Sequence, residues 1–205
     1  MFGSDNGASP EQIIRGDGHD PAAPPGSAGT FLCLGPGWST VSNAPLRLHK
    51  HWVHEGGIAS PFIVYWPAGV HDRGKLRHTP AHFIDVLPTV LELAGAATPE
   101  KRNDQNTPPL PGRSLVPTFH QDVTIEREYL YWHHMRNRAI RVADWKLVSA
   151  GGKTGYGAWE LYNLASDRAE MDDLAQAHPD VVKRLADLWQ KCEDQFRSQA
   201  GTVEP

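Results

Sequence analysis

The C-terminal third of the chain carries the most regular pattern of hydrophobic and polar positions. Residues 179–196 repeat apolar side chains at intervals of three and four, which predicts an amphipathic helix whose first position suits Pro179. Its apolar face consists of Val181, Leu185, Leu188, Trp189, Cys192 and Phe196. Ahead of it, short alternating segments separated by turn residues predict antiparallel strands at 129–132, 138–142, 145–148 and 159–162.

Two apolar segments stand out nearer the N-terminus. Residues 61–67 form a short run between prolines without strict alternation, so we expect a strand that is covered on both faces. Residues 85–95 predict a helix, with Asp85 as its N-cap and Gly95 just beyond its last turn. The expected buried stripe of this helix is formed by Leu87, Val90, Leu91 and Ala94.

Glycine and proline dominate the rest of the N-terminal part. Residues 7–45 hold seven glycines and six prolines, which predicts a long irregular segment, and the apolar stretch 30–34 within it indicates partial burial. Residues 4–7 have the character of a loop that follows a strand. We therefore expect the chain to begin inside a structural element, and a parallel sheet built from this chain alone to lack neighbours. Residues 96–112, polar and rich in proline, mark a candidate domain boundary.

Composition narrows the class of protein. The chain has 205 residues, enough to bury a sizeable core, and its net charge of −4 disfavours nucleic acid as a partner. No apolar run approaches the roughly 20 residues that a membrane span needs, and the first residues lack the basic and apolar regions of a signal peptide. Two cysteines are too few for a disulfide framework. We expect Cys33 to be buried and inert, and Cys192 to lie in the core.

Asp5 and Asn6 are the first candidates for chemistry. Adjacent carboxylate and amide oxygens, followed here by Gly7, can approach a hard divalent cation such as Ca²⁺ or Mg²⁺. An ordinary turn explains the same residues, because Asp-Asn-Gly is favoured in turns. The residues alone leave both interpretations open.

A group of basic and protonatable side chains precedes a Gly-Gly pair at 56–57. Such a group could hold an anionic substrate, with a lysine as a compact positive charge for an oxyanion. Its members are Arg47, His49, Lys50, His51 and His54. Residues 51–55 match neither the H-E-x-x-H nor the H-x-x-E-H order of zinc motifs, so zinc is disfavoured.

Residues 131–134 place two aromatic side chains ahead of His133 and His134. This pattern suits the lining of a substrate pocket, although a half-exposed strand is its more frequent meaning. Neither a G-x-S-x-G elbow, nor a P-loop, nor a dinucleotide fingerprint occurs in the sequence.

Taken together, these segments resemble the C-terminal part of the sulfatases, in particular the arylsulfatase branch of the alkaline-phosphatase-like superfamily. The matching stretches run in the family's order and cover nearly the whole chain, and it is their ordered co-occurrence that carries the resemblance. They are residues 4–7, 42–45, Lys50, 55–58, 61–67, 84–95, 112–115, 138–148 and 159–164.

The resemblance implies an α/β fold in two parts. Residues 1–120 would form the incomplete C-terminal part of an alkaline-phosphatase-like α/β sheet domain, and residues 121–205 a small antiparallel sheet with a closing C-terminal helix. The resemblance also implies that Asp5 and Asn6 bind a divalent metal, expected to be calcium, and that Lys50 contacts the sulfate. The chain would then belong to an arylsulfatase-type sulfuric ester hydrolase acting on a sulfate ester.

The chain departs from the sulfatase pattern at the nucleophile. Sulfatases carry a C-x-P-x-R segment whose cysteine becomes formylglycine, and neither Cys33 nor Cys192 lies in such a segment. A serine equivalent, the paired N-terminal aspartates and the family's other sulfate-binding Lys and His are also missing. We therefore expect no catalytic residue here, a formylglycine in a missing N-terminal part, and no appreciable activity of this chain alone. His133 and His134 remain candidate substrate contacts.

Two other functions stay open. A phosphonate monoester hydrolase or phosphodiesterase of the same superfamily would share this architecture, although the 42–45 segment favours sulfate. A truncated relic, or a module that associates through an incomplete sheet edge, would have no activity of its own. A full-length form with a signal peptide would be periplasmic or secreted.

Overall fold

The computed structural model describes residues 1–12, 19–30, 33–102 and 104–200. Contacts within the chain divide it into two compact units. One unit comprises Met1 and Val64–Glu128, and the other comprises Phe2–Ile63 together with the chain from Tyr129 onward. The resemblance to sulfatases implies a different division, at residue 120, between an incomplete α/β domain and a small C-terminal part. That division stays a prediction.

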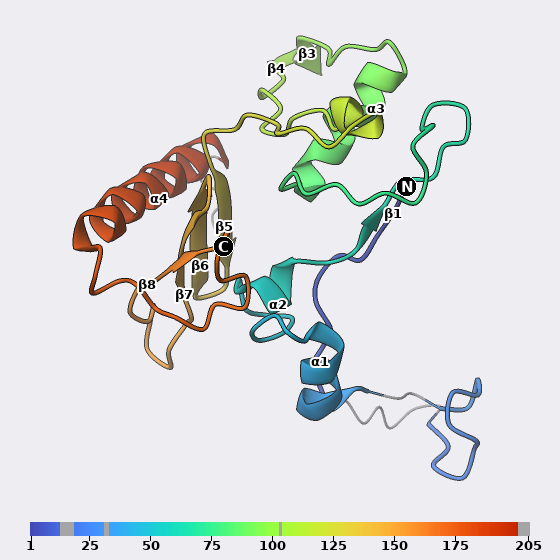
Figure 1. Ribbon diagram of the computed structural model, residues 1–205, viewed down its shortest axis with the longest axis vertical. Helices are drawn as coiled ribbons and strands as arrows, with labels where there is room; N and C mark the ends of the chain where they lie inside the picture. Colours follow the sequence, from blue (N-terminus) through green and yellow to red (C-terminus); the bar gives the residue numbers. More distant parts are fainter. Residues whose placement is uncertain (13–18, 31–32, 103, 201–205) are drawn as a thin grey trace. The chain divides into compact units, whose positions relative to one another are not determined.

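The second unit is built on a four-stranded antiparallel sheet (Figure 1). Its strands follow one another in the order β5-β6-β7-β8, each hydrogen-bonded to the next along the chain. The four strands predicted from alternation are thereby confirmed. Their bounds are β5 Leu130–His134, β6 Asn137–Val142, β7 Trp145–Ser149 and β8 Glu160–Asn163.

The predicted C-terminal helix, α4 (Pro179–Ala200), lies across one face of this sheet (Figure 1). Alternate strand residues and the apolar helix face form one buried cluster of Ile140, Leu147, Leu161, Leu185, Trp189 and Cys192. The Trp189 indole Nε1 also donates a hydrogen bond to the Trp132 carbonyl oxygen at 3.2 Å. The predicted helix, its apolar face and the buried position of Cys192 are confirmed.

The opposite face of the sheet is covered by the segment that leads into the short helix α2 (Glu55–Ile58). Val53 packs there against a second buried cluster, which also contains Ala139, Val148, Tyr162 and Leu164. Because neighbouring residues of a strand point to opposite faces, the same four strands serve both layers. The sheet is therefore held between α4 and the segment that carries the predicted anion-binding residues.

Short elements complete this unit. Strand β1 (Phe2–Gly3) pairs antiparallel with β2 (Phe62–Ile63), and helix α1 (Gly35–Asn43) interrupts the segment that was expected to be irregular over 7–45. The expected strand at 61–67 is only two residues long, and Ile63 is 56% exposed. The expected coverage on both faces is therefore wrong. In the described part of the chain, β1 pairs along the edge of β2, and the face that carries Ile63 stays open.

Burial of Cys33 was also predicted, and it is wrong. Cys33 is exposed, although its neighbours in the sequence are apolar. An apolar neighbourhood in the sequence predicts burial only where another segment packs onto it. Phe31 and Leu32, which belong to the same predicted stretch, lie outside the described residues.

The first unit contains helix α3 (Val86–Leu93), which confirms the helix expected at 85–95. Gly95 ends it with φ of 61°, as expected for the residue beyond a helix C-terminus. The remaining elements are the 3₁₀ helices η1 (Phe83–Asp85) and η2 (Val116–Phe119), and the strand pair β3 (Lys101–Arg102) and β4 (Gln105–Asn106).

The buried stripe predicted for this helix is wrong. Leu87 and Val90 are exposed, and the buried helix residue is Thr89. Its hydroxyl donates to the Asp85 carbonyl oxygen at 2.6 Å and accepts from the Leu115 backbone N–H at 2.9 Å. These hydrogen bonds orient the helix with Thr89 toward the following segment. In the described part of the chain its apolar side is therefore exposed.

Asp85 stands at the N-cap position of α3, as predicted, but its side chain makes no capping hydrogen bond to that helix. Its carboxylate forms an ion pair with Arg127 at 2.9 Å and accepts the backbone N–H groups of His82 and Arg113 at 2.8 and 2.7 Å. These contacts gather three segments of the first unit around one buried charge. None of the helices in the described ranges combines the length and the apolar character that crossing a membrane requires.

Candidate functional site

The loop that carries Lys50 lies against the N-terminal segment that carries Asp5 and Asn6. The Lys50 backbone N–H donates to the Ala8 carbonyl oxygen at 3.1 Å, and the Gly7 N–H donates to the Gly57 carbonyl oxygen at 3.0 Å. The Asn43 side chain accepts from the Ala8 N–H at 2.9 Å. Segments about forty residues apart in the sequence are thereby joined by their backbones.

Glycine is required where these segments meet. A Cβ atom added to Gly7 would lie 1.8 Å from the Gly56 carbonyl oxygen, and one added to Gly57 would lie 2.0 Å from the Trp52 carbonyl oxygen. Both contacts are far inside van der Waals distance, so a side chain at Gly7 would force the two segments apart and one at Gly57 would distort the loop itself. The Gly-Gly pair therefore acts by allowing the close approach of backbones.

The Lys50 side chain lies beside a carboxylate that the sequence analysis did not single out. Its Nζ is 3.3 Å from the Glu11 Oε2, and the His51 Nε2 is 3.4 Å from the Glu11 Oε1. Ser9 donates a hydrogen bond to the same carboxylate at 2.9 Å. The Ser9 hydroxyl first, and then Lys50, lower the pKa of Glu11. Glu11 thus serves as an internal counter-ion for Lys50 and also lies beside the His51 ring.

His134 extends this group and His133 does not. The His51 and His134 rings stack with their centroids 6.2 Å apart and planes 24° apart. His133, the preceding residue of β5, points to the other face, where its Nδ1 lies 3.0 Å from the Glu193 Oε2 of α4. We call Glu11, Lys50, His51 and His134 the Lys50 cluster.

The backbone around Lys50 has an unusual conformation. Leu48 and His51 have φ values of 65° and 88°, in the left-handed region that residues other than glycine rarely adopt. Such a conformation persists only when the surrounding contacts impose it. The loop is therefore shaped by its packing and not by its own preference.

Asp5 and Asn6 lie at the surface beside this loop. The Asn6 Nδ2 donates to the Asp5 Oδ2 at 2.5 Å, and Asn6 borders an open cavity of about 740 Å³ that Ser42, Asn43 and Arg168 also line. Carboxylate and amide oxygens suit calcium, which takes about six to eight oxygen ligands. The pair fits as part of such a set, and the described residues contain no group of three or more His, Cys, Asp or Glu side chains arranged for a metal ion.

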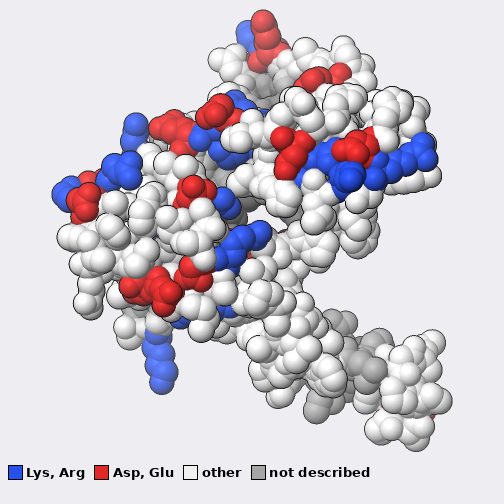
Figure 2. Space-filling view, in the orientation of Figure 1, with Lys and Arg blue, Asp and Glu red and all other residues white. Residues whose placement is uncertain are grey.

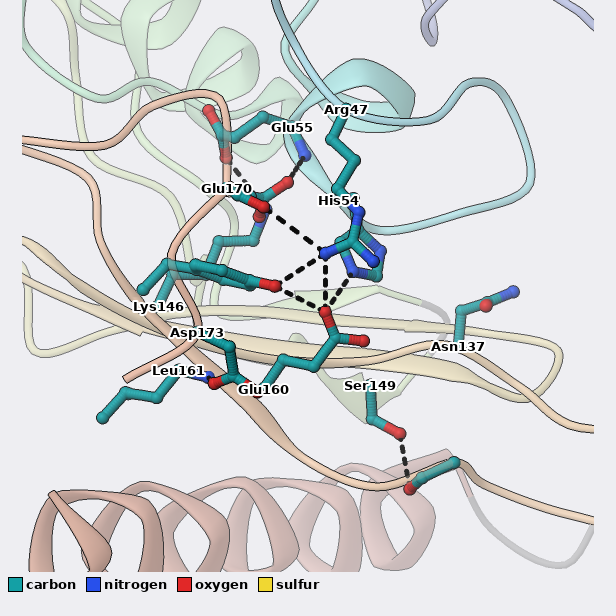
Figure 3. A network of polar contacts seen from close by, with 12 residues as sticks. Arg47, His54, Glu55, Asn137, Lys146, Ser149, Glu160, Leu161, Glu170 and Asp173 are labelled. Carbon is teal, nitrogen blue, oxygen red and sulfur yellow. Dashed lines mark hydrogen bonds and ion pairs between the residues drawn. The ribbon is translucent and has the colours of Figure 1, made fainter. Parts of the chain in front are cut away.

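A buried ionic network anchors the Lys50 loop to the sheet (Figure 3). Lys146 on β7 has no exposed surface, and its Nζ lies 2.9 Å from both the Glu55 Oε1 and the Glu170 Oε1. Glu170 also accepts the Glu55 backbone N–H at 2.8 Å, and Arg168 donates to the Glu55 Oε2 at 2.9 Å. We call these four residues the Lys146 network.

The charges of this network are balanced by pairing. Burial by itself raises the pKa of Glu55, but the nearby Lys146 and Arg168 outweigh it, and the pKa of Glu55 is lowered overall. Glu55 therefore stays ionised inside the protein. Its ionised form is what allows Lys146 to remain charged in a position without water.

A second set of contacts joins the same loop to β8. Arg47 donates to the Glu160 Oε2 at 2.7 Å and to the Tyr162 hydroxyl oxygen at 2.6 Å, and Tyr162 donates to Glu160 at 2.6 Å (Figure 3). The buried His54 has its Nε2 3.5 Å from the same carboxylate. The contact with His54, followed by those with Tyr162 and Arg47, lowers the pKa of Glu160 to about 2.

The basic group recognised in the sequence thus divides by task. Arg47 and His54 attach the loop to the sheet, while Lys50 and His51 face Glu11. Glu11, Lys146 and Glu170 were missed, because nothing in their local sequence indicates a partner more than thirty residues away.

Comparison with known proteins adds a family to this geometry. A family model described as "N-sulphoglucosamine sulphohydrolase, C-terminal" matches residues 47–197. An uncharacterized sulfatase of Schizosaccharomyces pombe is 29% identical over 167 residues, which cover 80% of this chain and 30% of that protein. An N-acetylgalactosamine-6-O-sulfatase of Bacteroides thetaiotaomicron is 29% identical over 153 residues, which cover 68% of this chain and 28% of that protein.

Solved structures agree with the fold. The crystal structure of Ps i-CgsB in complex with k-i-k-neocarrahexaose aligns with a TM-score of 0.57 and 26% identity, over 73% of this chain and 32% of that one. The sheet with its C-terminal helix, together with the matched sequence, defines a class, the alkaline-phosphatase-like α/β proteins. The predicted fold class is thereby confirmed. Within that class the chain belongs to the sulfatase family, whose C-terminal portion it matches. It spans about 30% of the length of these curated relatives.

Substitution of Lys146 tests the buried network. Lys146→Met leaves the buried Glu170 without its cation and Glu55 with Arg168 alone, and we expect a loss of about 3–5 kcal/mol in the free energy of unfolding. The control is Lys183→Met, which breaks an exposed pair with Asp187 and should cost no more than about 1 kcal/mol. Urea unfolding followed by circular dichroism measures both, and equal losses would contradict a special role for Lys146.

The low pKa of Glu160 predicts how stability depends on pH. A carboxyl group whose pKa is lowered on folding contributes stability that is full above its ordinary pKa and is lost as the pH falls through its folded pKa. For Glu160 this window runs from its ordinary value of 4.5 down to about 2. We expect Glu160→Gln to be less stable than the wild type at pH 7, and the difference to shrink steadily between pH 5 and pH 2. Thermal melts across this range measure it, and a constant difference would refute the assignment.

Proposed function

We propose that this chain forms the C-terminal part of a metal-dependent sulfuric ester hydrolase. The observation that carries the proposal is the backbone junction between the two predicted site segments, in which Lys50 N–H donates to the Ala8 carbonyl oxygen. This junction joins the segment that carries Lys50 to the segment that carries Asp5 and Asn6, in a chain of the sulfatase family. An anion bound there would meet both the lysine and the metal that Asp5 and Asn6 would help to hold.

The residues of the chain suit charge neutralisation at a sulfate group. Lys50 would donate hydrogen bonds to a sulfate oxygen, and its charge would oppose the negative charge that grows on the ester as the S–O bond breaks. His134, stacked on His51, extends the same edge and would contact the substrate. A divalent metal, calcium by the chemistry of its oxygen ligands, would polarise the sulfate when bound.

His133 is the weaker of the two predicted histidine contacts. Its Nδ1 faces Glu193 and its Nε2 lies 3.0 Å from the Tyr156 hydroxyl oxygen, so both ring nitrogens have partners within the sheet and helix layer. We therefore assign the substrate contact to His134. His133 would support the strand that carries it.

The nucleophile would come from outside this sequence. The 205 residues contain neither C-x-P-x-R nor S-x-P-x-R, so a formylglycine would be supplied by another segment or chain. Sequencing the DNA upstream of the Met1 codon tests this directly. An in-frame extension that encodes such a segment supports the proposal, and a stop codon with no such segment nearby removes the catalytic role of this chain.

Binding of inorganic sulfate tests the Lys50 cluster in the chain itself. Glu11 competes with an anion for Lys50, so we expect Glu11→Gln to raise the affinity for sulfate about fivefold and Lys50→Ala to lower it about tenfold. The control is Lys75→Ala, which removes an exposed lysine of the other unit and should leave the affinity for sulfate unchanged. Isothermal titration calorimetry measures all four proteins, and unchanged affinity in Lys50→Ala would refute the anion site.

Turnover tests the complete proposal. In a chain extended by its nucleophile segment, we expect Lys50→Ala to lower kcat on an aryl sulfate at least a hundredfold, because an oxyanion loses its cation in the transition state. The 205-residue chain alone should show no hydrolysis. Comparison of aryl sulfate with aryl phosphonate and a phosphodiester separates the sulfatase from its superfamily relatives. Unchanged turnover in Lys50→Ala, or preferred hydrolysis of the phosphorus esters, would overturn the proposal.

A further inference from the structure

Arg138 on β6 lies inside a cluster of aromatic rings at one end of the sheet. Its guanidinium carbon is 4.2 Å from the ring centroid of Tyr156, 3.9 Å from that of Trp159 and 5.4 Å from that of Trp189. Stacking on aromatic faces partly compensates a guanidinium for lost water. It leaves the N–H groups, which lie in the plane of the guanidinium, without acceptors.

Among the described residues, Arg138 lacks the carboxylate partner that Arg47 and Arg127 have. Arg47 is paired with Glu160 and Arg127 with Asp85. Across the described ranges, the Arg138 side chain has neither an ion pair nor a hydrogen bond, and its Nε is buried without an acceptor. The buried Nε therefore lacks an acceptor that an oxyanion could supply, and a guanidinium, which carries five N–H donors and no acceptor, is suited to bind one.

The β5–β6 hairpin end that carries Arg138 and the loop after β7 are basic. Residues 133–141 and 150–157 contain three arginines and one lysine but no Asp or Glu. The Arg136 Nη1 donates to the Gly152 and Lys153 carbonyl oxygens, which holds the two loops together. The adjacent carboxylate, Glu193, is already bound by Tyr131, His133 and Arg197. On the face shown in Figure 2, by contrast, acidic and basic side chains are interspersed.

This end of the sheet is directly connected to the Lys50 cluster. The Asn137 Nδ2 donates to the His51 carbonyl oxygen at 2.9 Å, and the Asn137 Oδ1 accepts from the Gly151 N–H at 2.9 Å. One side chain therefore joins the Lys50 loop to the loop that carries Tyr156. Tyr156 is 44% exposed, so its ring is available to a ligand that also reaches Arg138.

We propose that Arg138 and Tyr156 form a second anion-binding subsite, which takes a sulfate or carboxylate group of an anionic sugar chain. The guanidinium would donate paired hydrogen bonds to the oxyanion, and partial burial strengthens such charge-assisted bonds. The exposed phenol ring offers a flat apolar surface for the face of a sugar ring. The inference rests on the proposed function, since it specifies the class of sulfate ester as one with more than one anionic group.

Dextran sulfate binding by the 205-residue chain tests the subsite. Because Trp159 and Trp189 contact Arg138, tryptophan fluorescence reports an anion that binds there. We expect Arg138→Gln to weaken binding about tenfold, and Arg184→Gln, which removes an exposed arginine of α4, to weaken it less than twofold. Neutral dextran should not bind. Near-ultraviolet circular dichroism checks that each variant is folded.

A second variant and a second polyanion separate the remaining outcomes of this binding experiment. Tyr156→Ala changes a partly exposed side chain and should weaken binding about threefold, which keeps the test decisive if Arg138→Gln fails to fold. Equal binding of polyglutamate would mean that the surface recognises an acidic protein or charge alone, and it would overturn the sugar assignment. Binding by Arg138→Gln within twofold of the wild type would overturn the subsite.

Lys50→Ala distinguishes this inference from the proposed function. If the Arg138 subsite exists, Lys50→Ala loses inorganic sulfate but keeps most of its affinity for dextran sulfate. If dextran sulfate binding depends on Lys50 and not on Arg138, the subsite is wrong and the proposed function stands. If it depends on Arg138 while Lys50→Ala binds sulfate normally, the subsite stands and the proposed anion role of Lys50 is wrong.

Discussion

Lys146 carries a positive charge at a position on β7 that has no contact with water, and the geometry of the site follows from how that charge is matched. Two carboxylates reach it, Glu55 from α2 and Glu170 from the loop after β8. Burying such an arrangement adds little net stability, because desolvation costs about as much as pairing returns. Its effect is positional, since any displacement of α2 from the sheet would leave a buried charge unpaired. The residues that precede Glu55 are thereby held in one place, Lys50 among them.

The site is therefore a surface loop supported by a buried ionic layer. Arg47 and His54 reinforce the attachment through Glu160, and glycines allow the N-terminal segment to approach the loop closely. Within this frame the outward-facing cation, Lys50, is accompanied by the carboxylate of Glu11. Arg138 is a contrasting case, because aromatic rings surround it and, within the described ranges, no carboxylate is paired with it. An anion that binds as proposed would therefore displace Glu11 from Lys50, whereas at Arg138 it would be the first anionic partner.

Local pattern was a sound guide wherever the apolar side of an element is buried by neighbouring parts of the same chain. The helix at 179–196 and the four strands were recognised because their apolar residues repeat with the period of the element and face α4 or the Lys50 loop. The same reasoning failed for the apolar stripe of α3, where a buried threonine and its hydrogen bonds determine which side faces inward. It failed too for residues 61–67 and for Cys33, since apolar sequence does not reveal whether another segment packs there.

The sequence alone was sufficient for the family, the small antiparallel sheet with its helix, and the candidates Asp5, Asn6 and Lys50, because these depend on residue order and on short-range periodicity. The partners of those residues became evident only when the chain was folded. Glu11 meets Lys50, His51 stacks on His134, and Glu55 meets Lys146 through contacts between segments 39 to 91 residues apart. Contacts of this kind follow from how the backbone brings distant segments together, and such long-range approach leaves no mark in the local sequence.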